Sequence, residues 1–135
     1  MVSLNKDPKG TAFTVTCDAL DTSTGVSARD RMVTFHTLSD KTKDASFISR
    51  PGHIFPLVAK DGGVLERNGH TEAGVDLCRL AMPNEEPVAV IAELTNDDGT
   101  MKRLRDCAIF AKEHGIRLIT IEALQKFRLS SGCTL

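Results

Sequence analysis

The most hydrophobic run in the chain, PVAVIAEL at residues 87–94, places the strongest limit on how the chain can fold. The run is rich in Val and Ile and is bounded by Pro87 and by a turn-forming stretch at residues 95–99. Its length and composition predict a strand that is buried on both faces. A carboxylate, Glu93, stands near the end of this strand, where acidic side chains are rare without a partner.

The segments on either side of that run alternate between strand-like and helix-like patterns. Strands are predicted at residues 12–17, 53–59 and 117–121, with a short extended return at 64–66 after a tight turn at 61–63. Helices are predicted at residues 27–38, 71–82, 104–111 and 121–127. Strands that alternate with helices indicate an α/β fold with layered α-β-α architecture.

The helix boundaries and buried faces are predicted from local signals. Ser27 is a candidate N-cap with Asp30 at the third position, and Gly115 is the expected residue after the helix that starts near residue 104. Helical spacing predicts two apolar faces, one made of Ala28, Met32 and Phe35 and the other of Ala73, Leu77, Leu80 and Ala81.

Length and composition favour a single ordinary globular domain. The chain has 135 residues and contains no repeat, low-complexity tract or linker, so residues 1–135 are expected to form one domain. Its net charge of −1 and its lack of Trp and Tyr argue against a nucleic-acid partner. No apolar run reaches the roughly 18 residues of a membrane span, so no membrane association is expected.

The cysteines bear on the cellular compartment. Cys17, Cys78, Cys107 and Cys133 are scattered without a C-x-x-C pair, a spacing that fits neither a zinc site nor a compact disulfide framework. Reduced thiols and a cytoplasmic location are therefore expected.

The sequence RNGHT at residues 67–71 is a candidate anion site. It lies at a predicted junction of strand, turn and helix, where unpaired backbone N–H groups favour a phosphate. Arg67 and the Thr71 hydroxyl could add hydrogen bonds to an anion. The alternative is that Thr71 caps the helix, Gly69 makes the turn and His70 is solvated.

Two further residues could carry acid/base chemistry. His53 follows Gly52 at the start of a predicted strand and is either a general acid/base or a structural histidine. Glu93, with its apolar flanks, could have the raised basicity that a general base needs.

Three motifs occur in a fixed order, RPGHIFPL, then RNGHTEAGVDL, then AELTNDDGTM, together with GTAFTVT and TGVSARDR upstream. With these motifs the chain resembles the 3,4-dihydroxy-2-butanone 4-phosphate synthases of riboflavin biosynthesis, from about Lys9 to Phe127. The resemblance implies that family's fold and a homodimeric, metal-dependent lyase. Its substrate would be ribulose 5-phosphate and its products 3,4-dihydroxy-2-butanone 4-phosphate and formate.

The resemblance also implies roles for individual residues. His53 and Glu93 match the family's acid/base positions, and His70 matches a ligand of the Mg²⁺ or Mn²⁺ ions, two of which usually occupy each active site. The expected substrate contacts are Arg67, Asn68, Gly69, His70, Thr71 and Glu93, with Thr24 and Ser27 at the phosphate end.

The sequence departs from the family at its beginning. Members of the family start with a segment that contains an acidic loop, of the type Asp-Arg-Glu-Asn-Glu-Gly-Asp, and this loop supplies a carboxylate ligand for the metal. Nothing before Asn5 matches it, so the chain is expected to be an N-terminally truncated form of the synthase fold. Glu66 and Glu72 are the nearest acidic replacements. The alternative function is a catalytically inactive homologue that binds sugar phosphate or only dimerises.

Overall fold

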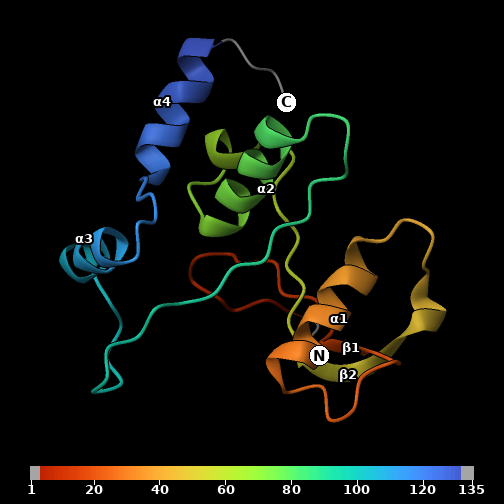
Figure 1. Ribbon diagram of the computed structural model, residues 1–135. Helices are drawn as coiled ribbons and strands as arrows, with labels where there is room; N and C mark the ends of the chain where they lie inside the picture. Colours follow the sequence, from red (N-terminus) through yellow and green to blue (C-terminus); the bar gives the residue numbers. More distant parts are fainter. Residues whose placement is uncertain (1–3, 132–135) are drawn as a thin grey trace. The chain divides into compact units, whose positions relative to one another are not determined.

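The structure, a computed structural model, describes residues 4–131, so Cys133 lies outside the described residues. Contacts between residues group the chain into two compact units. The first contains the described residues up to Ala59 together with Asn84–Val88, and the second contains Lys60–Pro83 and the described residues from Ala89 onward. Figure 1 labels the helices and strands of both units.

The first unit is built on a pair of antiparallel strands, β1 (Cys17–Ala19) and β2 (Ile48–Ile54). Ala19 pairs with Ile48 and Cys17 with Ile54, and the register shifts between Cys17 and Asp18. Pairing beyond the strands is reduced to an isolated bridge between Phe13 and Leu57. The predicted strands at residues 12–17 and 53–59 are therefore wrong in their bounds. Pro56 has no N–H group to donate, so regular pairing cannot continue through the second of them.

Helix α1 (Ala28–Ser39) packs against these strands, and a short 3₁₀ turn, η1 (Ala45–Phe47), precedes β2 (Figure 1). The Ser27 N-cap is confirmed, because its hydroxyl accepts the Asp30 N–H at 3.1 Å. The predicted apolar face is wrong. The buried residues of α1 are Asp30, Thr34 and Thr37, while Met32 remains 48% exposed.

Buried hydrogen bonds explain why α1 turns a polar face toward the strands. The Thr34 hydroxyl accepts the Ala19 N–H at 3.0 Å and donates to the Asp30 carbonyl at 3.2 Å. Polar groups that find partners in this way can be buried at little cost, and a hydrophobicity pattern does not report such partners.

In the second unit, helix α2 (His70–Ala81) contacts a 3₁₀ turn, η2 (Gly63–Leu65), and helix α4 (Ile121–Ser131). The predicted helix at residues 71–82 is confirmed to within one residue at each end. Its predicted apolar face is wrong, because the buried residues are the acidic Glu72 and Asp76. The turn at residues 61–63 is confirmed, with Gly63 at φ +60°, but the extended return after it is wrong because η2 is helical.

The remaining helices match their sequence signals. Helix α3 (Leu104–Glu113) is followed by Gly115 at φ +64°, which confirms the predicted glycine after its end. Helix α4 starts at Ile121 as predicted and continues beyond the predicted end to Ser131. Glu122 lies in its first turn, where a carboxylate interacts favourably with the helix dipole. None of the described helices is long and apolar enough to cross a membrane.

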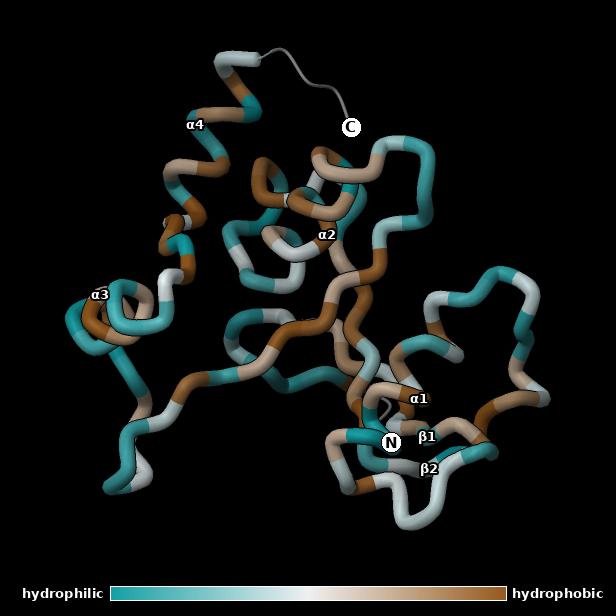
Figure 2. Tube along the Cα trace, in the orientation of Figure 1, coloured by the Kyte–Doolittle hydropathy of each residue, from teal (hydrophilic) through white to brown (hydrophobic). Residues whose placement is uncertain are grey.

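The predicted strands at residues 87–94 and 117–121 are wrong for the described part of the chain. Both segments are irregular, and Figure 2 shows the hydrophobic run between α2 and α3 as a chain without regular structure. Val90 is 58% and Ile91 48% exposed. A strand needs a neighbour for its backbone N–H and C=O groups, and within residues 4–131 the only paired strands are β1 and β2.

Candidate active site

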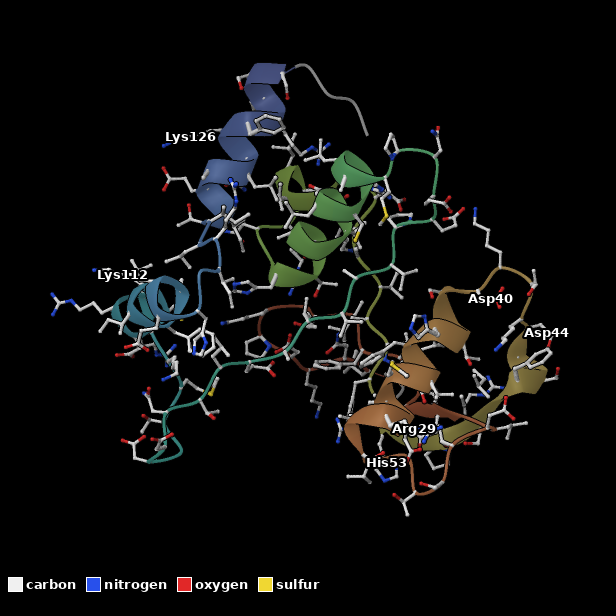
Figure 3. The ribbon with its side chains drawn as sticks, viewed as in Figure 1. Arg29, Asp40, Asp44, His53, Lys112 and Lys126 are labelled. Carbon is white, nitrogen blue, oxygen red and sulfur yellow. The ribbon has the colours of Figure 1, made fainter. Side chains whose placement is uncertain are left out.

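His53 and Asp18 form a close pair in the first unit. The His53 Nδ1 atom lies 2.6 Å from Asp18 Oδ2, and the His53 backbone N–H donates to Asp18 Oδ1 at 2.9 Å. The Asp18 side chain is 10% exposed and the His53 side chain 48% exposed, so the ring reaches the surface while its partner is buried (Figure 3). The shift in register between Cys17 and Asp18 accompanies this pairing across the two strands.

The charge on Asp18 follows from its surroundings. Burial alone would raise the pKa of the Asp18 carboxyl, but the hydrogen bonds from the His53 amide and ring outweigh it and hold this pKa below its usual value. Asp18 is therefore a carboxylate at neutral pH and accepts a hydrogen bond from the Nδ1–H group of the ring. The other ring nitrogen, Nε2, is then the atom that can exchange a proton with a substrate.

Two glycines allow this pair to form. Gly25 has φ +79°, and a Cβ atom there would overlap the Asp18 carboxylate and lie 2.7 Å from His53 Nδ1. A Cβ atom on Gly52 would overlap the backbone of Cys17 and Asp18. Each glycine therefore permits a close approach that no other residue allows without a shift of its neighbours.

The loop that contains Thr24 and Ser27 is held next to this pair by Asp30. The Asp30 carboxylate accepts from the Ser23 hydroxyl at 2.8 Å and from the Gly25 N–H at 3.1 Å. The donation from the Ser23 hydroxyl is the largest of the effects that keep the pKa of Asp30 below its usual value. Thr24 and Ser27 are both exposed at the start of α1, and Gly25 brings their loop against His53.

The residues Arg67, Asn68, Gly69, His70 and Thr71 lie together in the second unit, at the start of α2. Gly69 is the N-cap residue, and no side chain caps the helix, so the alternative in which Thr71 caps it is wrong. His70 and Asn68 are exposed, while Thr71 is half-buried within the first turn. The backbone N–H groups at this helix start are the kind that bind anions.

Arg67 is held in place by a buried carboxylate. Its Nη1 atom donates to Glu72 Oε2 at 2.6 Å, and Glu72 Oε1 accepts the Lys60 N–H at 3.1 Å. Glu72 is 1% exposed. A Cβ atom on Gly69 would overlap the Arg67 guanidinium and lie 2.5 Å from Glu72 Oε2, so this glycine allows the ion pair to close over the helix start.

Glu93 is exposed and lies in the irregular segment of the second unit. The prediction that it ends a buried strand is therefore wrong. His53, Thr24 and Ser27 share the first unit, whereas Glu93 and the residues at the start of α2 belong to the second.

The described donors do not make a magnesium site by themselves. Within residues 4–131, no group of three or more His, Cys, Asp or Glu side chains is placed to hold a metal ion. Glu66 accepts the Gly62 N–H at 2.9 Å, and Glu72 is paired with Arg67. His70 alone is too weak a donor set for a hard cation, which prefers several oxygen ligands.

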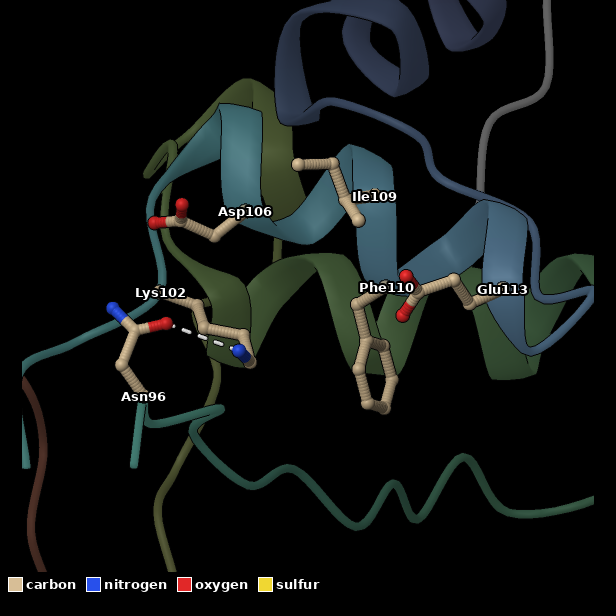
Figure 4. Close-up of a pocket in the computed structure, with 6 residues that line it drawn as sticks. All are labelled: Asn96, Lys102, Asp106, Ile109, Phe110 and Glu113. Carbon is tan, nitrogen blue, oxygen red and sulfur yellow. Dashed lines mark hydrogen bonds between the residues drawn. The ribbon is translucent and has the colours of Figure 1, made fainter. Parts of the chain in front are cut away.

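A small pocket elsewhere in the second unit is not the predicted site. It has a volume of about 140 Å³ and lies beside α3 (Figure 4). Lys102 Nζ donates a hydrogen bond to Asn96 Oδ1 at 3.0 Å on one side of it, and Ile109 and Phe110 supply apolar walls. None of the residues that line it is a predicted site residue.

Sequence reasoning missed the carboxylates Asp18 and Asp76, and it named Glu72 only as a possible replacement metal ligand. A signal existed for each of them. Asp18 directly follows an alternating strand-like segment, and Glu72 and Asp76 are spaced one helical turn apart, so they share a face of α2. Asp30 was identified only as a helix-start residue, although it also holds the loop at residues 23–25.

Comparison with known proteins shows which protein family the chain is related to. The sequence model of the family described as 3,4-dihydroxy-2-butanone 4-phosphate synthase matches residues 1–127. The 3,4-dihydroxy-2-butanone 4-phosphate synthase of Saccharomyces cerevisiae is 55% identical over 128 residues, which is 93% of this chain and 61% of that protein. The riboflavin biosynthesis protein RibBA of Bacillus cytotoxicus is 52% identical over 128 residues, which is 95% of this chain and 32% of that protein.

A solved structure supports the same conclusion and the α/β fold class. A 3,4-dihydroxy-2-butanone 4-phosphate synthase in complex with two magnesium ions matches with a TM-score of 0.83 and 39% identity, over 98% of this chain and 67% of the solved one. The chain spans about three fifths of the length of the yeast relative. On the matched residues and this shared fold, the chain belongs to the 3,4-dihydroxy-2-butanone 4-phosphate synthase family.

Proposed function

We propose that the protein performs the reaction of its family, the conversion of ribulose 5-phosphate into 3,4-dihydroxy-2-butanone 4-phosphate and formate in riboflavin biosynthesis. The observation that carries this proposal is the His53–Asp18 pair, in a chain that is 55% identical to the yeast synthase. In the reaction, one carbon leaves the sugar phosphate as formate, which makes the protein a lyase.

His53 is proposed as an acid/base residue. Because the Asp18 carboxylate holds the proton on Nδ1, Nε2 can take a proton from the carbon next to the substrate ketone and return it later. This is the step that produces the enediol in sugar-phosphate chemistry of this kind. Glu93 is the proposed second acid/base residue and substrate contact.

Substrate contacts are proposed separately in each unit. Arg67, Asn68, Gly69, His70 and Thr71 are the proposed substrate contacts at α2, where Glu72 fixes the Arg67 guanidinium. Thr24 and Ser27 are proposed at the phosphate end, where the start of α1 adds partial positive charge.

We also propose that the protein uses Mg²⁺ or Mn²⁺, with His70 as one ligand. Support comes from the relative whose structure contains two magnesium ions. When bound, such ions stabilise negative charge that develops on substrate oxygens.

A homodimer and a cytoplasmic location complete the proposal. The absence of disulfides among the described cysteines Cys17, Cys78 and Cys107 is compatible with a reducing compartment.

The test is formate production by the purified chain with ribulose 5-phosphate and Mg²⁺. We expect formate release that His53→Ala and Glu93→Ala each slow by about 10²- to 10⁴-fold, while His36→Ala, which removes an exposed histidine of α1, leaves it unchanged. No release by the unmodified chain would contradict the proposal. If ribulose 5-phosphate nevertheless bound, and Arg67→Ala removed that binding, the protein would be a catalytically inactive sugar-phosphate binder.

A further inference from the structure

The turn that leads into the start of α2 is bound on its buried side by α4. The Arg128 Nη1 atom donates both to the Gly62 carbonyl and to Asp76 Oδ2, each at 2.8 Å. Arg128 is 6% exposed and Asp76 is fully buried. One guanidinium nitrogen of α4 is thus hydrogen-bonded both to α2 and to the turn (Figure 1 labels the two helices).

Two more hydrogen bonds with side chains hold Val64, two residues further along the turn. The Val64 N–H donates to Asp76 Oδ2 at 2.9 Å, and the Val64 carbonyl accepts from Gln125 Nε2 at 2.7 Å. Val64 is itself fully buried. A Cβ atom on Gly63 would overlap the Asp76 carboxylate, so the turn lies directly against this buried ion pair.

The same turn also positions the backbone of Arg67 through a hydrogen bond. The Gly63 carbonyl accepts the Arg67 N–H at 3.1 Å and the Glu66 N–H at 3.0 Å. A displacement of Gly63 would therefore move the Arg67 backbone. At its other end, the turn begins at Lys60, whose N–H is bound by the same Glu72 that holds the Arg67 guanidinium.

We propose that Asp76 and Arg128 are positioning residues, which set the geometry of the Lys60–Arg67 turn and through it the substrate contacts at the start of α2. Neither residue reaches the exposed face on which His70 and Asn68 lie, so their effect passes through the turn. Arg128 lies on α4, directly after residues 1–127, which the family model matches. This role rests on the proposed function, because it concerns binding of the same substrate.

Arg128→Gln tests the role, with Lys126→Gln as the matched control. Both residues lie on α4, but Lys126 pairs with Glu122 at the surface, is 74% exposed and extends away from the helix in Figure 3. We expect Arg128→Gln to weaken binding of ribulose 5-phosphate by about 10- to 100-fold, since small misplacements of binding groups have effects of this size. Lys126→Gln should change the Kd by less than about twofold, as exposed pairs contribute little.

A second variant separates positioning from a failure to fold. Arg128→Gln leaves the Asp76 charge buried without its main partner, whereas Asp76→Asn combined with Arg128→Gln removes both charges and keeps an acceptor for the Val64 N–H. Calorimetric Kd values for ribulose 5-phosphate should be measured at a temperature at which circular dichroism shows every variant folded. Hydrogen exchange of the peptide that covers residues 60–69 reports on the turn directly.

Weaker binding and faster exchange of that peptide in both Arg128 variants, with neither change in Lys126→Gln, would support the role. A folded double variant with a Kd within about twofold of the unmodified chain would overturn it. Formate release is measured in parallel. If the unmodified chain binds ribulose 5-phosphate but releases no formate, the proposed function is contradicted, and the Kd values of the variants still decide the positioning role. If the unmodified chain does not bind ribulose 5-phosphate, both proposals are contradicted.

Discussion

His53 Nδ1 lies 2.6 Å from Asp18 Oδ2, and the backbone N–H of the same histidine donates to the other oxygen of the same carboxylate. Asp18 therefore fixes both the position of the His53 backbone and the orientation of its ring. A side chain that only filled space beside the histidine would do neither. This double contact is the observation on which the proposed acid/base role of His53 rests.

Asp18→Asn should reduce formate release by about 10²- to 10⁴-fold, the usual contribution of a well-positioned acid/base group. The amide can donate to Nδ1 as well as accept from it, so the proton would no longer be confined to Nδ1. Steady-state kinetics measure the effect. Asp21→Asn, a change at an exposed aspartate of the following turn, is the control and should leave the rate unaltered. Equal rates for the two variants would show that Asp18 does not orient the ring.

Gly25→Ala should destabilise the fold more than Gly99→Ala does. Both glycines have positive φ, +79° and +85°, so both changes carry the cost of a left-handed conformation, about 1–2 kcal/mol. Only at Gly25 would the new methyl group overlap Asp18 and crowd His53, while nothing lies within 4 Å of a Cβ at Gly99. We expect an additional loss of about 1–3 kcal/mol at Gly25 in urea unfolding followed by circular dichroism. Equal losses would contradict the close packing of the Asp18–His53 pair.

The stability of the chain should fall in acid, and Asp30 should contribute to the fall. The hydrogen bonds from Ser23, Ser27 and Gly25 lower the pKa of Asp30 in the folded state. A depressed pKa adds stability above the unfolded value of about 3.9, and this stability is lost as pH falls through the folded value. Thermal midpoints of the unmodified chain and of Asp30→Asn should therefore converge as the pH falls below about 3.9. A constant difference over this range would contradict the assignment.

Glu72→Gln should destabilise the second unit by about 3 kcal/mol, because it removes the negative charge that pairs with the Arg67 guanidinium in a buried ion pair. The Glu72 side chain is 1% and that of Arg67 20% exposed. Glu66→Gln, at an exposed residue nearby, is the control, with an expected change within about 0.5 kcal/mol. Chemical denaturation measures both. If the two variants unfold at the same denaturant concentration, the Arg67–Glu72 pair does not stabilise the start of α2.

The helices could be predicted from the sequence because their signals are local. Ser27 accepts the Asp30 N–H at the start of α1, and Gly115 has positive φ just beyond α3. Neither feature depends on residues far away in the chain. The turn at residues 61–63 is likewise set by its glycines.

The buried faces and the strands could not be predicted, because they depend on distant partners. Thr34 is buried because its hydroxyl meets the Ala19 N–H, and Asp76 because Arg128 and the Val64 N–H reach it. A pattern of hydrophobic spacing contains no such information. Residues 87–94 have the composition of a strand, but composition cannot supply the neighbouring strand that pairing requires.

The candidate site was predicted in part. The motifs identified His53 and the residues at the start of α2, whereas the hydrogen bonds that Asp18 and Glu72 make to hold them appear only in the structure. The buried environment predicted for Glu93 depended on a strand at residues 87–94 that is not present in residues 4–131.

Formate release from uniformly carbon-13-labelled ribulose 5-phosphate, followed by NMR, tests the central claim most directly. In the presence of Mg²⁺, the unmodified chain should produce labelled formate, and His53→Ala should be slower by about 10²- to 10⁴-fold while it still binds the sugar phosphate. Formate produced by His53→Ala at the rate of the unmodified chain would contradict the account, because His53 would then have no part in the reaction.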